Sequence, residues 1–324
     1  MSGAGQGTLA EAGFERYRKT TRREQFLSEM EQVVPWGELC ALVEPVYPKR
    51  TGGAGRPAVG LERMLRLYCL QQWYDLSDPA IEEALYDSAA MRRFVGIDLG
   101  REPVPDETTV CKFRHLIERH DLGKRLFERI GEYLQARGFR LSRGTIVDAT
   151  IIAAPSSTKN QAKARDPQMH QTKKGNQWYF GMKAHIGIDR RSKLIHSVVA
   201  TPANVADCTV LPQLLHGAET RAYGDQAYRG QRAVIRARAP RAKDFTNRRA
   251  KHRGRIDEVE RAKNRAKSRV RARVEHAFHV IKRVFGFAKV RYRGMAKNAN
   301  RLFSTCALAN LFIVRKRLLQ LQAT

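Results

Sequence analysis

The first part of the chain spaces its apolar residues as amphipathic helices do. Between positions 61 and 74, apolar residues recur mostly three or four positions apart, so they share one face of a helix. Ser77 or Asp78 can cap a following helix, and Gly138 is suited to end the last one. The pattern therefore predicts a series of helices over residues 14–137.

Beyond Arg143 the pattern becomes that of β-strands. Residues 144–152 are rich in β-branched side chains, which is typical of a buried strand. Apolar and polar residues alternate over 180–188, as in a strand with one buried face. A turn at 190–193 leads into 194–201, and we expect these two strands to pair as a hairpin.

The remaining segments complete the predicted arrangement. We expect a polar loop over 155–175, a short strand over 220–224 and a short candidate strand over 233–237. Residues 257–285 are rich in Ala and Arg, which favours a helix that stops at Gly286. The expected fold class is α+β, a helical N-terminal region followed by a mixed sheet flanked by helices.

Positive charge is concentrated in one segment. The 324 residues include 60 Lys and Arg against 32 Asp and Glu, a net charge of +28. Residues 226–300 alone hold 24 basic and five acidic residues, whereas residues 1–140 are neutral overall. A basic block of this kind is expected of a protein that binds the nucleic-acid backbone, because Lys and Arg displace condensed counterions. A solvated basic helix or tail explains the same run equally well.

Cysteine usage and apolar runs bear on where the protein works. The five cysteines are scattered and never form a CxxC pair, which argues against a disulfide framework and a structural zinc site. Residues 1–19 hold no apolar run after a basic start, and the stretch 306–314 is too short to cross a membrane. We expect no secretion signal, no membrane span and a cytoplasmic location.

Two aspartates follow or interrupt predicted strands. Asp148 lies inside the apolar run 146–152, where an unpaired carboxylate costs several kcal/mol, so we expect a cation or hydrogen bonds beside it. Asp225 follows the strand 220–224, where its side chain would project toward the same crevice. For either one alone, a turn-forming or helix-capping role explains the residue as well.

Glu275 is the only acidic residue between Arg261 and the C-terminus. On a continuous helix, Arg271 and Lys282 lie within about 40° of Glu275, so the three share one face. One interpretation is an ion pair between Arg271 and Glu275, four positions apart. The other is a metal-binding glutamate flanked by two cations that hold DNA phosphates.

Two Asp and one Glu surrounded by basic residues suit two-metal chemistry on phosphodiesters. Two Mg²⁺ ions about 4 Å apart can activate the attacking oxygen and stabilise the leaving oxygen, each with only one or two carboxylate ligands. Mn²⁺ accepts the same oxygen ligands. The sequence has no P-loop, GxGxxG fingerprint or convincing Ser/His/Asp arrangement.

The N-terminal helices admit two interpretations. A helix that follows Thr108 carries Lys112, Arg114 and Arg119, which would lie near the groove if the region were a DNA-binding module. A plain helical bundle explains the pattern as well, and it agrees better with the absence of net charge over 1–140.

Several segments resemble bacterial transposases of the insertion sequence 5 family. They occur in the family's order over nearly the whole chain, at residues 30–36, 72–78, 113–117, 144–159, 170–178, 181–187 and 271–278 with Lys282. The resemblance implies a ribonuclease-H-like catalytic core with a DDE triad of metal ligands, Asp148, Asp225 and Glu275. It also implies a helical region for DNA binding or dimerisation over 1–140 and a catalytic domain over 141–324.

The resemblance implies a DNA transposase. It would bind the terminal inverted repeats of its own element as a dimer, hydrolyse the phosphodiester with Mg²⁺ or Mn²⁺, and join the freed 3′-hydroxyl to target DNA. In bacteria it would associate with the nucleoid. Two alternatives stay open, a ribonuclease-H-like nuclease and a catalytically silent DNA-binding protein.

Six residues are predicted to contact DNA. Arg271 and Lys282 flank the glutamate, Lys183 and His185 lie on the strand 180–188, and Arg248 and Arg249 belong to the basic segment 226–300.

Overall fold

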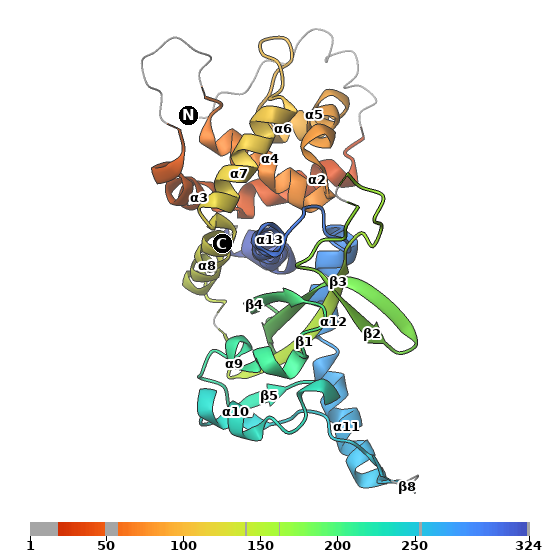
Figure 1. The fold of residues 1–324 in the computed structure, drawn as a ribbon. Helices are drawn as coiled ribbons and strands as arrows, with labels where there is room; N and C mark the ends of the chain where they lie inside the picture. Colours follow the sequence, from red (N-terminus) through yellow and green to blue (C-terminus); the bar gives the residue numbers. More distant parts are fainter. Residues whose placement is uncertain (1–18, 49–57, 140, 162, 253–254, 323–324) are drawn as a thin grey trace.

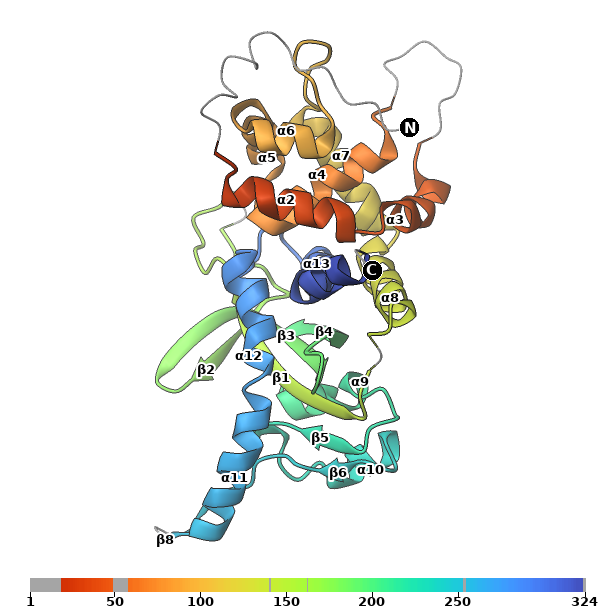
Figure 2. The same cartoon turned by 180° about the vertical axis from the view of Figure 1, so that it is seen from behind.

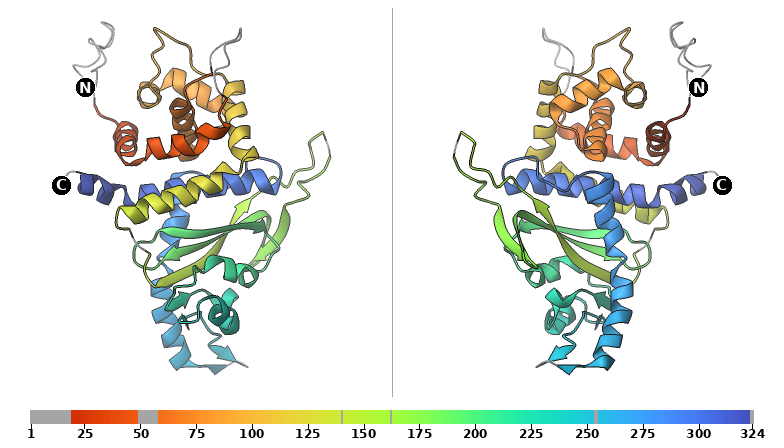
Figure 3. Two further views of the ribbon diagram at one scale, coloured as in Figure 1. Left: turned by 90° about the vertical axis from the view of Figure 1, so that its left-hand side faces the viewer. Right: turned by 90° about the vertical axis from the view of Figure 1, so that its right-hand side faces the viewer.

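The chain folds with its long C-terminal helix between a helical N-terminal part and a central sheet (Figure 1). The computed structural model describes residues 19–48, 58–139, 141–161, 163–252 and 255–322. The first residues of the predicted helical region, 14–18, lie outside the described residues. Helix α13 (Met295–Gln322) crosses the molecule where the two parts meet, and Figures 2 and 3 show the same order of layers from other sides.

The predicted N-terminal helices are present. Ser77 caps its helix by accepting a 3.2 Å hydrogen bond from the Ala80 N–H, and Gly138 adopts φ 85° just after the last helix. The helices are α2 (Arg22–Val33), α3 (Trp36–Val43), α4 (Leu61–Tyr74), α5 (Asp78–Asp87), α6 (Ala89–Val95), α7 (Glu107–Arg119) and α8 (Leu122–Ala136), with a short 3₁₀ turn η1 (Glu44–Val46) after α3.

A mixed sheet forms the centre of the second part. Its strands are β1 (Gly144–Ala153), β2 (His170–Lys174), β3 (Gln177–Asp189), β4 (Ile195–Pro202), β5 (Arg221–Tyr223) and β6 (Lys243–Asp244). The body of the sheet has the order β4-β3-β1-β5-β6, in which β3 is antiparallel to its neighbours and β1, β5 and β6 are parallel. The strands predicted over 144–152, 180–188, 194–201 and 220–224 and the β3–β4 hairpin are confirmed.

Two predictions about this region are wrong. The expected loop 155–175 contains β2, which pairs with the outer end of β3. The candidate strand 233–237 lies in a helix, α10 (Arg232–Arg238), and β6 supplies the last parallel strand instead. Only Ile235 of α10 is fully buried, so the short apolar run there marks one contact face of a helix.

Over residues 181–189 both faces of β3 are buried or nearly so, although alternation predicted one exposed face. The apolar side joins the main core, which runs from the N-terminal helices through α13 to the sheet. The other side is covered by α9 (Leu211–Leu214), which is part of a second core with Val147. A Cβ at Gly187 would lie 2.5 Å from the Leu214 carbonyl oxygen, so glycine permits this close approach.

The predicted helix 257–285 is interrupted. Its parts are α11 (Glu258–Arg271), α12 (Val274–His279) and a π-helical turn (Val280–Val284). At the break, the Arg273 side chain donates a 2.7 Å hydrogen bond to the Arg190 carbonyl of the β3–β4 turn. Gly286, with φ 75°, ends the helical run as predicted. Residues 257–285 have the helix-forming composition that the prediction used, but they contain no Gly or Pro that would indicate an interruption.

The remaining elements are short. They comprise the 3₁₀ turns η2 (Asp207–Val210) and η3 (Gln226–Tyr228) and a small hairpin of β7 (Lys251–His252) and β8 (Arg255–Ile256). Among the described residues, no helix is long and apolar enough to cross a membrane.

Candidate active site

Asp148 occupies the middle of β1 and is 7% exposed. Its Oδ1 accepts a 2.9 Å hydrogen bond from the Ala149 N–H. Its Oδ2 accepts a 2.9 Å bond from Arg271 Nη2 at the end of α11. Burial raises the pKa of the carboxyl, and Arg271 only partly offsets this effect. The cation expected beside a buried carboxylate is therefore Arg271.

Asp225 follows β5, the parallel neighbour of β1. The carboxyl ends of parallel neighbours meet at one edge of the sheet, which brings Asp225 to the rim of the pocket that contains Asp148. Its Oδ1 accepts a 2.8 Å hydrogen bond from the Ala227 N–H and so begins η3. Asp225 is thus both a local cap and a pocket residue.

Glu275 enters the same pocket from α12. Its Oε1 lies 3.3 Å from Arg271 Nη2, and 63% of its side chain is exposed. The buried apolar residues Val274, Ala277 and Phe278 hold this turn of the helix against the core. One pocket of about 360 Å³ therefore contains all three predicted acids, which come from separate segments of the chain.

A fourth carboxylate, Asp207, also lines this pocket. It lies in η2, after β4, and its Oδ1 accepts a 2.8 Å bond from Lys183 Nζ. The Lys183 ammonium donates a second bond, of 2.7 Å, to the Val205 carbonyl. Sequence reasoning missed Asp207 because no periodic pattern or charge run marks it. Lys183 was predicted to contact DNA, and the structure places it in the pocket wall with a carboxylate partner.

The prediction that His185 contacts DNA is wrong for the folded chain. The side chain is fully buried, and its Nε2 lies 2.8 Å from Thr201 Oγ1. Burial, with a contribution from Lys183, lowers its pKa to about 4, so the ring is neutral at pH 7. His185 belongs to the interior because α9 and its neighbours cover this face of β3.

Lys282 lies beside the carboxyl end of β1. Its Nζ donates a 2.9 Å hydrogen bond to the Ile151 carbonyl and lies 3.3 Å from Thr150 Oγ1. Thr150 and Ile151 themselves line the pocket. Burial lowers the pKa of Lys282, and Lys174 and Arg283 lower it further. Arg271 and Lys282 thus approach the same strand although the helix between them is irregular.

Arg248 and Arg249 do not line the pocket. Both are exposed, on the segment that leads from β6 toward α11. The Arg248 backbone exchanges hydrogen bonds with the Asn264 side chain of α11, at 3.0 and 2.7 Å. These two arginines lie on an outer surface of the protein, and their contact with DNA stays a prediction.

Arg114, considered above as a groove contact, is internal. Its guanidinium lies 2.8 Å from both Asp78 and Glu118, and the residue is 8% exposed. The DNA-binding interpretation of α7 therefore loses one of its three cations, whereas Lys112 and Arg119 are exposed.

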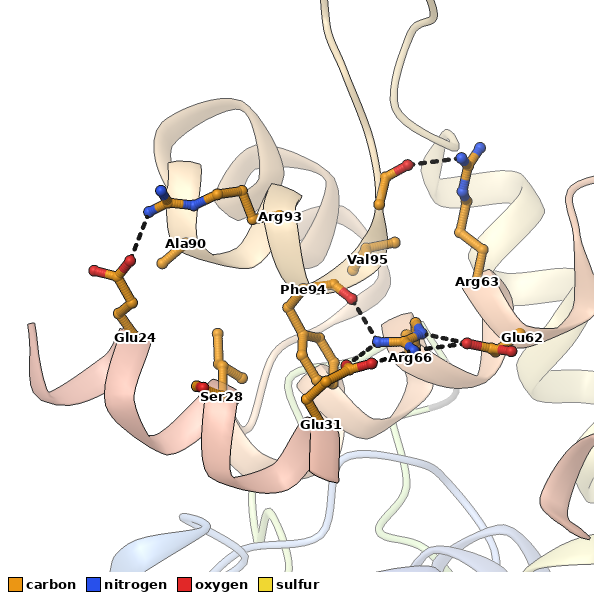
Figure 4. Close-up of a pocket in the computed structure, with 12 residues that line it drawn as sticks. Glu24, Ser28, Glu31, Glu62, Arg63, Arg66, Ala90, Arg93, Phe94 and Val95 are labelled. Carbon is orange, nitrogen blue, oxygen red and sulfur yellow. Dashed lines mark hydrogen bonds and ion pairs between the residues drawn. The ribbon is translucent and has the colours of Figure 1, made fainter. Parts of the chain in front are cut away.

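A larger pocket of about 600 Å³ lies between α2, α4 and α6. Figure 4 shows Arg66 and Arg93 pointing toward glutamates, whereas Arg63 points toward a backbone carbonyl. Arg66 binds Glu31 and Glu62, and Arg93 binds Glu24. These pairs join the helices, so the charged groups of this pocket serve the packing of the N-terminal part.

The strand order and the acidic pocket define the class of protein. The antiparallel strands β4, β3 and β1 are continued by the parallel strands β5 and β6, and the carboxylates lie on β1, just after β5 and on α12. This arrangement is a ribonuclease-H-like fold. Residues 140–311 match the family model described as Transposase DDE domain, and residues 14–116 match Transposase domain (DUF772). The chain belongs to the transposase DDE domain family, and it is a DNA transposase.

The chain also has a weaker match to a solved structure. It is the cryo-EM structure of the piggyBac transposase synaptic complex with hairpin DNA, at 10% sequence identity and a TM-score of 0.47. The similarity covers 94% of this chain and 77% of that chain.

Proposed function

We propose that this transposase is of the insertion sequence 5 type and that Asp148, Asp225 and Glu275 are its catalytic carboxylates. The observation that carries the proposal is their convergence on one pocket, from β1, the end of β5 and α12. Each alone has a local explanation, as a paired core carboxylate, a cap or a surface ion pair. Local roles do not require three such residues to share one pocket.

The donor set fits a divalent metal. It consists of carboxylate oxygens, which Mg²⁺ prefers, and the pocket already accommodates positive charge, because the Arg271 guanidinium bridges Asp148 and Glu275. Within the described part of the chain, no three acidic, His or Cys side chains are grouped closely enough to hold one ion together, so each ion would have only one or two of these carboxylates as ligands, with water and DNA phosphate as the others. Bound Mg²⁺, or Mn²⁺ in its place, would supply activation of the attacking oxygen and stabilisation of the leaving oxygen.

The cations around the pocket would position the DNA strand. Arg271 presents five donors in a planar fork that suits a phosphate as well as a carboxylate. We infer that it exchanges Asp148 for the scissile phosphate when DNA binds. Lys282 contacts Thr150 and Ile151, which line the pocket, and would hold a neighbouring phosphate.

The remaining surfaces would bind the rest of the DNA. The basic segment 226–300 would follow the duplex backbone, and Arg248 and Arg249 lie exposed on it. We propose that residues 1–140 serve DNA binding or dimerisation and that 141–324 form the catalytic domain. The working form would be a homodimer that holds two element ends and then target DNA, in the bacterial cytoplasm.

Product analysis tests this proposal. Labelled duplexes that carry both ends of the encoding element are incubated with target DNA and Mg²⁺, then resolved on a denaturing gel. We expect end cleavage with a free 3′-hydroxyl, followed by strands joined to the target. Cut strands without joining would identify a nuclease, and intact strands with tight binding would identify a silent DNA-binding protein.

A further inference from the structure

A second charged pocket, of about 450 Å³, lies at the start of β1, away from the acidic pocket. Its charged lining consists of four arginines and no acidic residue. They come from the residue before β1, the β3–β4 turn and the first residue of β5, so the fold brings them together from three separate segments. The four residues, which define the arginine pocket, are Arg143, Arg190, Arg191 and Arg221.

The acidic residues nearest to these arginines in the sequence are buried and already hydrogen-bonded. Asp189 accepts bonds of 2.6, 2.9 and 2.7 Å from the backbone N–H groups of residues 142, 191 and 192. Glu219 accepts bonds from two backbone N–H groups and from the Thr145 hydroxyl. Even with these two carboxylates counted, the four guanidiniums are in excess. Like charges that converge repel one another, and a bound anion relieves the repulsion.

The exposure of the four side chains indicates what kind of anion fits. Arg190 is half-buried, and its Nη1 donates a 3.3 Å hydrogen bond to the Tyr223 hydroxyl, whereas the other three arginines are exposed. Guanidiniums bind phosphate oxygens through a planar fork of donors. One anchored guanidinium with three in solvent suits a polyanion that passes across the pocket better than a small anion enclosed within it.

The arginine pocket also lacks the features of a single-strand site. No aromatic side chain lines it, and proteins that bind single-stranded nucleic acid combine basic residues with aromatic rings on which bases stack. Phosphate contacts alone are typical of backbone binding that positions a duplex. Because the chain is a DNA transposase, the polyanion that fits is duplex DNA.

The spacing along β1 separates this pocket from the acidic one. Gly144 lines the arginine pocket, and Asp148, four residues later on the same strand, lines the acidic pocket. At about 3.3 Å per strand residue, these two positions are about 13 Å apart, which corresponds to about four base-pair steps of duplex DNA. A phosphate bound by the arginines is therefore not the one that the acidic pocket would hold.

We propose that the arginine pocket is a second DNA site, which binds the backbone of duplex DNA several base pairs away from the phosphodiester that is cleaved. It positions the DNA and takes no part in breaking the bond. The inference goes beyond the proposed function, since it depends on the chain being a DNA transposase and not on which acids are catalytic.

The salt dependence of binding to a duplex of random sequence tests the inference. Affinity is measured by fluorescence anisotropy at several KCl concentrations without divalent metal. Replacing both Arg143 and Arg221 by Gln should flatten the slope of log affinity against log salt by about 0.9 for each phosphate that is no longer neutralised. Replacing both by Lys should keep the wild-type slope, because the charge is retained.

A matched control removes the same charge elsewhere. Lys316→Gln together with Arg317→Gln changes two exposed positions on α13 and should leave the wild-type slope. An unchanged slope in the Arg143 and Arg221 variant, or equal flattening in the α13 control, would overturn the second site. So would failure of the wild type to bind the random duplex.

A calorimetric titration with inorganic phosphate at constant ionic strength distinguishes a small-anion site. Phosphate binding that the Gln variant loses, with an unchanged slope for DNA, would assign the pocket to a free anion and overturn the proposal. Cleavage of element ends is a separate measurement, so failure of the catalytic assignment leaves the slopes as they are.

Discussion

Two arginines in this chain make the same set of contacts in different surroundings. Arg114 pairs with Glu118, four residues later, and with the distant Asp78. Arg271 pairs with Glu275, four residues later, and with the distant Asp148. Residue types and spacing are the same, so they cannot explain any difference in role.

Burial and access separate the two clusters. In the first, all three side chains are at most 15% exposed, and although burial acts against it, hydrogen bonds from Arg114 and Gln71 lower the pKa of Asp78. In the second, Glu275 is 63% exposed, the pocket is open, and burial raises the pKa of Asp148. The first cluster is buried on all sides and joins helices, whereas the second shares a single arginine between a buried and an exposed carboxylate in the lining of a pocket.

Replacing the matched glutamates should give the largest contrast. Glu275→Gln should lower the cleavage rate by on the order of 10³-fold, because the site would no longer have a ligand that stabilises charge in the transition state. Its thermal stability should be nearly unchanged since the side chain is exposed. Glu118→Gln should reduce stability and leave the rate per folded molecule as in the wild type. Equal rates for the two variants would remove Glu275 from the site.

Replacing the matched arginines should cost more stability in the Arg114 cluster than in the Arg271 cluster. Arg114→Ala should lower the free energy of unfolding by about 3 kcal/mol, because two nearly buried carboxylates lose their cation. Arg271→Ala should lower it by less than Arg114→Ala does, because only one of its two carboxylate partners, Asp148, is buried and Glu275 remains in water. In this variant strand transfer should slow more than binding weakens. Urea titrations and single-turnover assays check this, and similar stability losses would show that both clusters are structural.

Salt dependence compares the basic segment with the N-terminal helices. Replacing Arg248 and Arg249 by Gln should flatten the slope of log affinity against log salt by about 0.9 for each phosphate that the variant no longer neutralises. The matched change of the exposed Lys112 and Arg119 on α7 should flatten it less, since residues 1–140 carry no net charge. A larger effect from α7 would place the duplex on the N-terminal helices.

The smallest expected effect is on acid stability. The pKa of Asp78 in the folded chain is lowered from its ordinary value of 3.8, so its ionised form favours the folded state. This contribution is fully present above about pH 3.8 and is lost as the pH falls through the lowered pKa. Urea midpoints measured between pH 5 and pH 3 should therefore fall less steeply with acid in Asp78→Asn than in the wild type, and identical slopes would contradict the pairing.

The sequence predicted most elements of the fold because their periodicity is strong. The helix α4, the strand β1 and the β3–β4 hairpin have regular apolar spacing, and each formed where expected. Periodicity says nothing about what covers a strand, so the buried face of β3 and the interior position of His185 were missed. At the break between α11 and α12, Arg273 contacts a distant backbone carbonyl. A contact between residues so far apart in the sequence cannot be predicted from local spacing.

The site was predictable in part for a related reason. Asp148 and Glu275 stand out because each is an acid in an unusual setting, an apolar run or a basic helix. Asp207 has no distinctive pattern around it in the sequence, and it becomes a candidate only because the fold brings it to the pocket.

Single-turnover cleavage of a labelled element end by Asp148→Asn, with Asp78→Asn as the matched control, tests the central claim most directly. The account predicts that Asp148→Asn folds and binds DNA but does not cut it. It predicts that Asp78→Asn, at a temperature where it is folded, cuts at the wild-type rate. Cleavage by Asp148→Asn at the wild-type rate would show that the pocket formed by Asp148, Asp225 and Glu275 is not where the phosphodiester is broken.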